Sequence, residues 1–207
     1  MIDWIAMVTK HDALVFDYDG VIADTEPLHW RSWAALLLPY GIQLSWDEYC
    51  GMGRGATDRQ IYNVMLKRAE LPGVEEFASL NVHRKSQVRD WSLSEIPIAR
   101  ETVELLGSLD GGHIGLVTSS ERNDVEPVLR AAGILERFDA VVFGEDVAEH
   151  KPSPAPYLLI AERLGVGGGV AFEDSEPGLA SARAAGFEAI KVERPVDLPQ
   201  IVSRILE

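Results

Sequence analysis

Four short apolar runs, each followed at once by polar residues, constrain the fold of this chain more than any other feature. Within each run the apolar residues are consecutive and do not alternate with polar ones, as expected for strands of a parallel sheet covered on both faces. The runs occupy residues 13–16, 114–117, 140–143 and 170–172, and 189–192 supplies a fifth. Helical patterns ending at Gly133, Gly165 and Gly186 lie between them. We therefore predict an α/β fold with a parallel sheet.

Residues 26–95 follow a different pattern. Apolar residues recur there at helical spacing, beginning with Trp30, Trp33, Leu36 and Leu37, and no run resembles a buried strand. The sequence predicts a helical domain, 26–95, inserted after the first strand of a core made of 1–25 and 96–207. An insert at that position can close over a site at the end of the strand, like a lid.

The first apolar run leads directly into Asp17, Tyr18, Asp19 and Gly20. In an extended segment, residues two apart point to the same side, so Asp17 and Asp19 can reach one ligand while Tyr18 turns away. Gly20 lets the backbone turn tightly beside that ligand. An ordinary turn that uses Asp for local hydrogen bonds is the alternative for this segment alone.

Polar residues at the other strand ends favour a site. Open α/β sheets place ligands at the carboxyl ends of their strands, so widely spaced residues should converge there. The residues concerned are Asp17, Asp19, Thr118, Lys151, Glu173 and Asp174. Phosphoryl transfer through an aspartate needs a nucleophile, a proton donor, a cation and donors for the phosphoryl oxygens, and this set offers each of them.

Each residue has a candidate role. Asp17 can attack phosphorus, and Asp19 can protonate the leaving alcohol and later deprotonate water. Thr118 and the backbone amides of Ser119 and Ser120 can hold phosphoryl oxygens, although Ser and Thr before a helix are also ordinary N-caps. Lys151 can neutralise charge on Asp17 and the phosphate. The alternative is that Lys151 is an ordinary exposed lysine beside a proline turn.

The same acids can hold Mg²⁺, which prefers carboxylate and carbonyl oxygens in an octahedral arrangement. We assign it the Asp17 side chain, the Asp19 carbonyl and the Asp174 side chain. Glu173 is expected to bind the ion directly or to support its ligands from behind.

Composition excludes several function classes. A net charge of −14 argues against nucleic acid or an anionic membrane as partner, and no apolar run is long enough to span a bilayer. The lone cysteine, Cys50, excludes an internal disulfide and is expected to be a small buried side chain. No secretory signal is evident, so we expect a cytoplasmic protein. It is expected to be a monomer, because no apolar stripe is left over once the helices are assigned.

Four motifs, in order, carry a resemblance to the haloacid dehalogenase superfamily of phosphohydrolases, in the branch with a helical cap after the first strand. They are DYDGV at 17–21, LVTSS at 116–120, KPSP at 151–154 and EDS at 173–175. The resemblance implies a Rossmann-like core whose cap gates the site. It also implies Asp17 as nucleophile, Asp19 as general acid and base, Thr118 and Lys151 as phosphate holders, and a magnesium site that includes Glu173 and Asp174.

Within that superfamily, true dehalogenases lack the second aspartate, so Asp19 speaks against dehalogenation. Enzymes that cleave phosphonoacetaldehyde use a cap lysine, and nothing marks Lys67 or Lys85 for that role. The chain also resembles β-phosphoglucomutases around residues 24–29, which implies that His29 gates substrate. Arg54 lies near the place of the mutase's arginine without matching its spacing cleanly, although flanking glycines suggest a loop that approaches something closely.

We therefore predict a magnesium-dependent phosphatase that acts on a small phosphorylated metabolite, with a sugar phosphate favoured, through an aspartyl-phosphate. A β-phosphoglucomutase is the alternative. A phosphoacceptor receiver domain is a hypothesis of a different class, since receivers also combine clustered aspartates, a Thr or Ser and a Lys on a doubly wound sheet. A receiver needs neither a second catalytic acid nor an insert of this size.

Overall fold

The computed structural model describes residues 12–52, 58–66 and 74–206. The chain divides into two compact units. The core unit combines the chain up to Asp24 with the chain from Ile96 onward, and the helical unit is Thr25–Glu95. The two units are described separately below.

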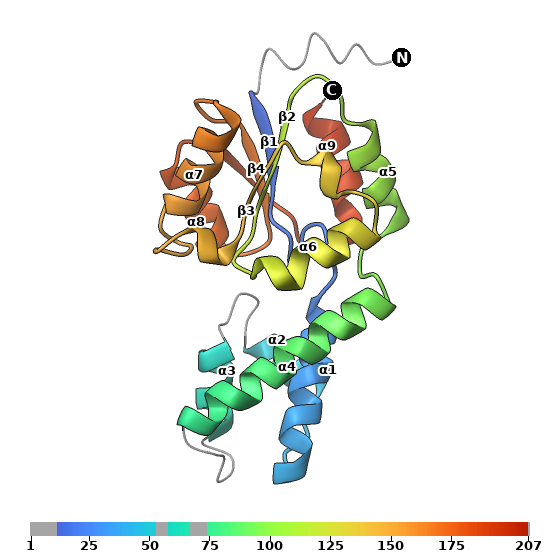
Figure 1. The fold of residues 1–207 in the computed structure, drawn as a ribbon, viewed down its shortest axis with the longest axis vertical. Helices are drawn as coiled ribbons and strands as arrows, with labels where there is room; N and C mark the ends of the chain where they lie inside the picture. The colour runs from blue at the N-terminus through green and yellow to red at the C-terminus, as the bar shows by residue number, and fades with distance from the viewer. Residues whose placement is uncertain (1–11, 53–57, 67–73, 207) are drawn as a thin grey trace. The chain divides into compact units, whose positions relative to one another are not determined.

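The described residues of the core unit form a five-stranded parallel sheet in the order β3-β2-β1-β4-β5 (Figure 1). Its strands are β1 (Ala13–Phe16), β2 (His113–Val117), β3 (Ala140–Val142), β4 (Val170–Glu173) and β5 (Glu188–Lys191). The predicted α/β class and all five predicted strands are confirmed. The chain builds outward from β1 to β3 and then returns to the other side of β1, which places a ligand-binding crevice at the carboxyl end of the central strand.

Helices cover both faces of the sheet, which explains the uninterrupted apolar runs (Figure 1). One face carries α5 (Arg100–Ser108), α6 (Arg122–Ala131) and α9 (Leu198–Ile205), and the other carries α7 (Ala155–Leu164) and α8 (Glu176–Ala184). Short 3-10 turns lie at η3 (Leu135–Arg137), η4 (Gly144–Asp146) and η5 (Pro195–Asp197).

The two faces have separate apolar clusters, because successive strand residues point to opposite sides. Phe16 stacks on Phe172, with ring centroids 4.9 Å apart, in the cluster beneath α5, α6 and α9. Val15 and Ala171 belong to the cluster beneath α7 and α8, which also contains Tyr157. The sheet is thus held from both sides, and its strand ends are fixed in place.

The described residues of the helical unit contain helices and no strand. The elements are α1 (Glu26–Leu37), η2 (Leu38–Tyr40), α2 (Trp46–Gly51), α3 (Asp58–Leu66) and α4 (Val74–Ser94). Their core includes Trp33, which is fully buried, and the stacked rings of Tyr62 and Phe77, 4.1 Å apart. Cys50 is exposed, contrary to the expectation that it is buried, because it lies near the end of the short α2, which has no buried residue. None of the helices described in either unit has the length and apolar character needed to cross a membrane.

The chain leaves and re-enters the core unit at neighbouring points. The Asp24 amide donates to the Pro97 carbonyl, with a nitrogen-to-oxygen distance of 2.7 Å. Asp24 and Pro97 are therefore neighbours in space, although the whole helical unit separates them in the sequence.

Candidate active site

Three charged side chains from different strand ends meet at the carboxyl end of β1. Asp17 follows β1, Glu173 ends β4, and Lys151 lies in the loop between η4 and α7. The Lys151 Nζ is 3.0 Å from Asp17 Oδ1 and 2.6 Å from Glu173 Oε1, and it donates to the Val117 carbonyl at 3.1 Å. All three side chains are at least nine-tenths buried. Lys151 is therefore a specific ion-pair partner and not an exposed lysine.

Tyr157 completes this cluster from α7. Its hydroxyl donates to Glu173 Oε1 at 2.6 Å, so that oxygen receives both a hydroxyl and an ammonium hydrogen. Tyr157 is fully buried, and its stripe position on α7 gave no sign of this role beyond apolar packing. A buried tyrosine hydroxyl needs a hydrogen-bond partner. That general requirement is the one hint in the sequence that Tyr157 makes a polar contact.

Burial and crowding of acids govern the electrostatics. The pKa of Asp17 is raised well above its usual value, first by burial and then by the nearby Glu173 carboxylate, and the attraction of Lys151 does not offset these two effects. The pKa of Lys151 is raised: burial alone would lower it, but Asp17 and Glu173 outweigh the cost. Lys151 therefore stays charged, whereas burial and the neighbouring acids disfavour the ionised form of Asp17 unless a further cation lies nearby.

The loop after β2 lies beside the second aspartate. The Ser120 hydroxyl donates to Asp19 Oδ2 at 2.7 Å, although the two residues are 101 positions apart. The Ser120 amide donates to the Thr118 hydroxyl oxygen at 3.0 Å, and Thr118 itself is buried. Ser120 thus lies next to Asp19, and Thr118 lies next to Ser120, as strand-end convergence predicts.

Gly20 has a geometric reason to be glycine. Its φ of +75° lies in the left-handed region, and a Cβ built on it would lie 2.3 Å from Asp174 Oδ2. The backbone after Asp19 therefore turns tightly against the Asp174 carboxylate. Tyr18 turns away into the apolar cluster beneath α5 and α6, as the alternation of side chains predicts.

The acids fit a hard divalent cation. Asp17, Glu173 and Asp174 each offer an oxygen within 4.8 Å of the others. Glu173 Oε2 is buried and has no hydrogen-bond partner among the described residues, and a nearby cation would offset the cost of burying it. Oxygen ligands from carboxylates are the donors that Mg²⁺ prefers, so the observed set matches the predicted ion.

The candidate residues of the insert are placed separately, in the helical unit. His29 lies half-buried in the first turns of α1, and its Nδ1 is 3.4 Å from the Arg84 guanidinium. Arg54 lies outside the described residues, and so do Gly53 and Gly55. Trp33 is core, whereas Trp46 is 38% exposed.

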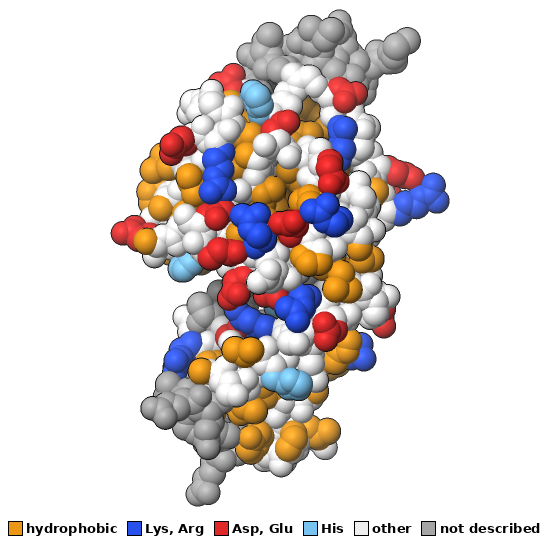
Figure 2. Space-filling model, in the orientation of Figure 1, with side chains coloured by type: hydrophobic (Ala, Val, Ile, Leu, Met, Phe, Trp, Pro, Cys, Tyr) orange, Lys and Arg blue, Asp and Glu red, His pale blue; other side chains and the backbone are white. Residues whose placement is uncertain are grey.

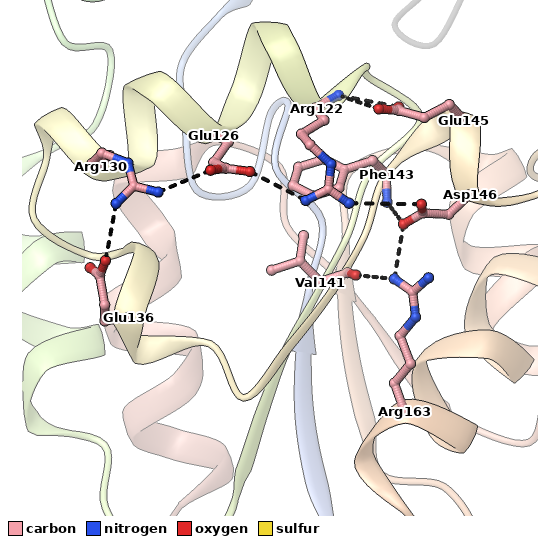
Figure 3. A network of polar contacts seen from close by, with 9 residues as sticks. All are labelled: Arg122, Glu126, Arg130, Glu136, Val141, Phe143, Glu145, Asp146 and Arg163. Atoms are coloured by element: carbon pink, nitrogen blue, oxygen red, sulfur yellow. Dashed lines mark hydrogen bonds and ion pairs between the residues drawn. The ribbon is translucent and has the colours of Figure 1, made fainter.

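A polar network braces the loop after β3 against the loop after β2 (Figure 3). Asp146 accepts from the Phe143 amide at 3.0 Å and from Arg163 at 2.9 Å, while Arg122 lies with its guanidinium carbon 4.2 Å from the centre of the Phe143 ring. The amide of Gly144, which lies between Phe143 and Asp146 in the sequence, donates to the Ser120 carbonyl at 2.9 Å. The network thus supports the backbone of the loop that carries Thr118 and Ser120.

Replacing Asp146 with Asn should lower the free energy of unfolding by about 1 kcal/mol near neutral pH, since the arginine partners are half exposed and screened. The pKa of Asp146 is lowered: partial burial alone would raise it, but hydrogen bonds from Phe143 and Arg163 outweigh that effect. A lowered folded-state pKa contributes stability above the unfolded value, about 4, and loses it as the pH falls through the folded value. Urea unfolding at about pH 7 and about pH 3.5 should therefore show the difference from wild type shrinking with acid.

Glu136→Gln is the matched control for that measurement. Glu136 is 73% exposed and pairs with Arg130 at 3.5 Å, so its loss should change stability by less than about 0.5 kcal/mol at either pH. An Asp146→Asn difference that stays constant, or grows with acid, would contradict the assigned sign.

Charged side chains of both signs share the surface. On the face shown in Figure 2, the described Lys and Arg side chains lie among Asp and Glu and form no continuous basic area. The whole sequence has a net charge of −14.

Comparisons with known proteins agree with this geometry. Residues 14–192 match the family model described as haloacid dehalogenase-like hydrolase. Fructose-1-phosphate phosphatase YqaB of Escherichia coli is 33% identical over 190 residues, covering 90% of this chain and 98% of that protein. The phosphorylated carbohydrates phosphatase of Thermotoga maritima is 34% identical, covering 86% and 83% respectively. The crystal structure of CbbY from Rhodobacter sphaeroides in complex with phosphate superimposes with a TM-score of 0.72 at 27% identity, covering 87% of this chain and 85% of that one. The match across residues 14–192, together with a relative 33% identical over 90% of this chain, shows that the chain belongs to the haloacid dehalogenase-like hydrolases.

Proposed function

We propose that this protein is a magnesium-dependent phosphatase that hydrolyses a phosphorylated carbohydrate through an aspartyl-phosphate. The observation that carries the proposal is the position of Asp17 at the end of the central strand, with its Oδ1 held 3.0 Å from a buried Lys151. Relatives named as phosphatases of fructose 1-phosphate and of phosphorylated carbohydrates support the substrate class.

The first half of the reaction forms the acyl phosphate. An Asp17 carboxylate oxygen bonds to phosphorus as the bond from phosphorus to the ester oxygen breaks, and Asp19 gives its proton to the leaving alcohol. Lys151 and the Thr118 hydroxyl balance the negative charge of the phosphoryl oxygens.

The second half releases phosphate. Asp19, now ionised, takes a proton from a water molecule whose oxygen bonds to phosphorus, and the bond to Asp17 breaks to give orthophosphate. The Ser120 hydroxyl, 2.7 Å from Asp19 Oδ2, orients that carboxylate. Bound Mg²⁺ would be held by Asp17, Asp174, the Asp19 carbonyl and Glu173, and would supply charge neutralisation that also favours the ionised form of Asp17.

The helical unit is proposed as the cap that recognises the part of the substrate beyond the phosphate, with His29 and Arg54 as candidate contacts. A mutase is not favoured, since the relatives from Escherichia coli and Thermotoga maritima compared above carry phosphatase names. A receiver-type switch is also disfavoured, because Asp19 supplies the second catalytic acid that a switch does not need.

The test is phosphate release with Mg²⁺ across a panel of sugar, hexitol and other metabolite phosphates, including fructose 1-phosphate. We expect steady turnover that chelation with EDTA stops and added Mg²⁺ restores. A single turnover followed by slow decay would instead indicate a switch. Conversion of β-glucose 1-phosphate to glucose 6-phosphate without phosphate release would indicate a mutase.

A further inference from the structure

Glu173 is a buried carboxylate at the end of β4 whose two oxygens have different surroundings. Its Oε1 accepts from the Tyr157 hydroxyl and from the Lys151 ammonium group, each at 2.6 Å. Its Oε2 is buried and has no hydrogen-bond partner among the described residues. An ammonium group has only donors, so Oε1 must be an unprotonated acceptor and the Tyr157 hydroxyl must donate. The protein thus engages one oxygen of Glu173 and leaves the other open.

The Glu173 carboxylate is held in one orientation. A carboxylate oxygen has about two acceptor sites, and the donors from Tyr157 and Lys151 fill both sites of Oε1. Beside Oε2, the backbone of Gly178 on α8 comes so close that a Cβ there would overlap the carboxylate. Rotating the carboxylate would therefore break two charge-assisted hydrogen bonds or press it against α8. Glu173 is oriented before any ion binds.

The hydroxyl of Tyr157 is not needed for packing. The centre of its ring lies 5.5 Å from that of Phe187 and 5.7 Å from Lys151 Nζ, and a phenylalanine would keep both contacts. Burying a hydroxyl costs free energy unless the hydroxyl is hydrogen-bonded. The bond to Glu173 Oε1 offsets that cost. The effect of the hydroxyl on the site therefore passes through Glu173.

The number of oxygens that Glu173 can offer matters for the kind of ion bound. Mg²⁺ requires nearly ideal octahedral geometry, whereas Ca²⁺ takes about six to eight oxygens and readily binds a carboxylate through both of its oxygens. Because both acceptor sites of Oε1 are filled, Glu173 can offer a cation Oε2 alone. This restriction suits Mg²⁺ and withholds from Ca²⁺ the second oxygen of a bidentate carboxylate.

We propose that Tyr157 is a positioning residue that makes the site selective for Mg²⁺ over Ca²⁺, because it occupies Glu173 Oε1 and limits Glu173 to one oxygen for the ion. The inference rests on the proposed function, whose magnesium site it uses. It adds a determinant of metal choice on α7, outside the four sequence motifs. Tyr157 itself touches neither the ion nor the substrate.

The test compares the dissociation constants of Mg²⁺ and Ca²⁺, measured by calorimetric titration of the full chain without substrate or phosphate. In Tyr157→Phe, one acceptor site of Glu173 Oε1 becomes free. The ratio of the Ca²⁺ to the Mg²⁺ dissociation constant should therefore fall roughly tenfold, mainly through tighter Ca²⁺ binding. A loss of packing alone would weaken the binding of both ions and leave the ratio unchanged.

Tyr49→Phe is the matched control. The Tyr49 hydroxyl donates to Glu26 Oε2 at 2.8 Å in the helical unit. The variant therefore loses the same kind of bond, to a carboxylate that is not assigned to the metal site. Its ratio of dissociation constants should remain that of wild type.

Crystal structures of wild type with Mg²⁺ and with Ca²⁺ provide a measurement that does not depend on the folding of a variant. In both, Glu173 Oε1 should stay bonded to Tyr157 and Lys151 and should not coordinate the ion. The Ca²⁺ complex of Tyr157→Phe should instead show both Glu173 oxygens within about 2.6 Å of the ion.

An unchanged ratio in Tyr157→Phe would overturn the proposal, and so would the same fall in Tyr49→Phe, a bidentate Glu173 in wild type with Ca²⁺, or a wild type that binds neither ion. Failure of the proposed function would look different, because wild type would then bind Mg²⁺ selectively and release no phosphate from any ester.

Discussion

Asp17→Asn should lower phosphate release by at least about a thousandfold, because an amide cannot form the acyl phosphate on which the proposed pathway depends. Lys151 Nζ lies 3.0 Å from Asp17 Oδ1, and Asn keeps an oxygen there, so the fold should survive. The measurement is steady-state phosphate release at saturating Mg²⁺, together with thermal unfolding of the same preparations.

The variant Asp19→Asn distinguishes the role of Asp19 from that of Asp17. It removes the proton donor and should cost about a hundredfold to ten-thousandfold with an alkyl phosphate. The cost should be smaller for the first step with p-nitrophenyl phosphate, whose phenolate leaves with little need of a proton. Rapid-quench trapping should then detect phosphorylated protein in Asp19→Asn and none in Asp17→Asn. If Asp17→Asn retained more than a tenth of wild-type turnover, Asp17 would be excluded as the nucleophile.

Gly178→Ala should weaken Mg²⁺ binding by at least about tenfold and destabilise the protein by about 1–3 kcal/mol. A Cβ on Gly178 would lie 1.9 Å from Glu173 Oε2, and Glu173 is fully buried with its other oxygen held by Tyr157 and Lys151. The carboxylate can therefore move away from the new methyl group only by straining its contacts with Tyr157 and Lys151. Calorimetric titration with Mg²⁺ and the Mg²⁺ dependence of phosphate release measure the effect.

Gly107→Ala provides the matched control. Gly107 lies in α5, and a Cβ there would meet nothing within 4 Å, so the substitution should leave Mg²⁺ binding unchanged. Gly107 is in the last turn of α5, where alanine in place of glycine should stabilise the helix by less than about 1 kcal/mol. Wild-type affinity for Mg²⁺ in Gly178→Ala would show that Glu173 is not needed at the metal site.

Much of the core could be predicted from the sequence, because a parallel sheet covered on both faces requires continuous apolar strands and parallel strands bring their carboxyl ends to one edge. The ends of all five strands therefore lie within one residue of their predicted positions. The same rule predicted that Asp17, Lys151 and Glu173 would meet, and they do.

Contacts made through packing were not predictable. Tyr157 sits on an apolar stripe, and only the three-dimensional approach of α7 to β4 shows that its hydroxyl reaches Glu173. Gly178 follows the last motif in an Ala-rich helix, where nothing in the sequence reports the distance to a carboxylate. Arg84 reads as one of several charges on a long helix, since the period of α4 does not reveal which charge is buried.

The bond between the Asp24 amide and the Pro97 carbonyl has an evolutionary consequence. Inserts are tolerated where their two attachment points are adjacent, because the host chain then closes almost as short a loop with the insert as without it. The segment between these points can be lengthened, shortened or exchanged as a cassette while the strands keep their register. Descendants of one such gene can thus inherit the aspartates unchanged while the segment between the two attachment points diverges.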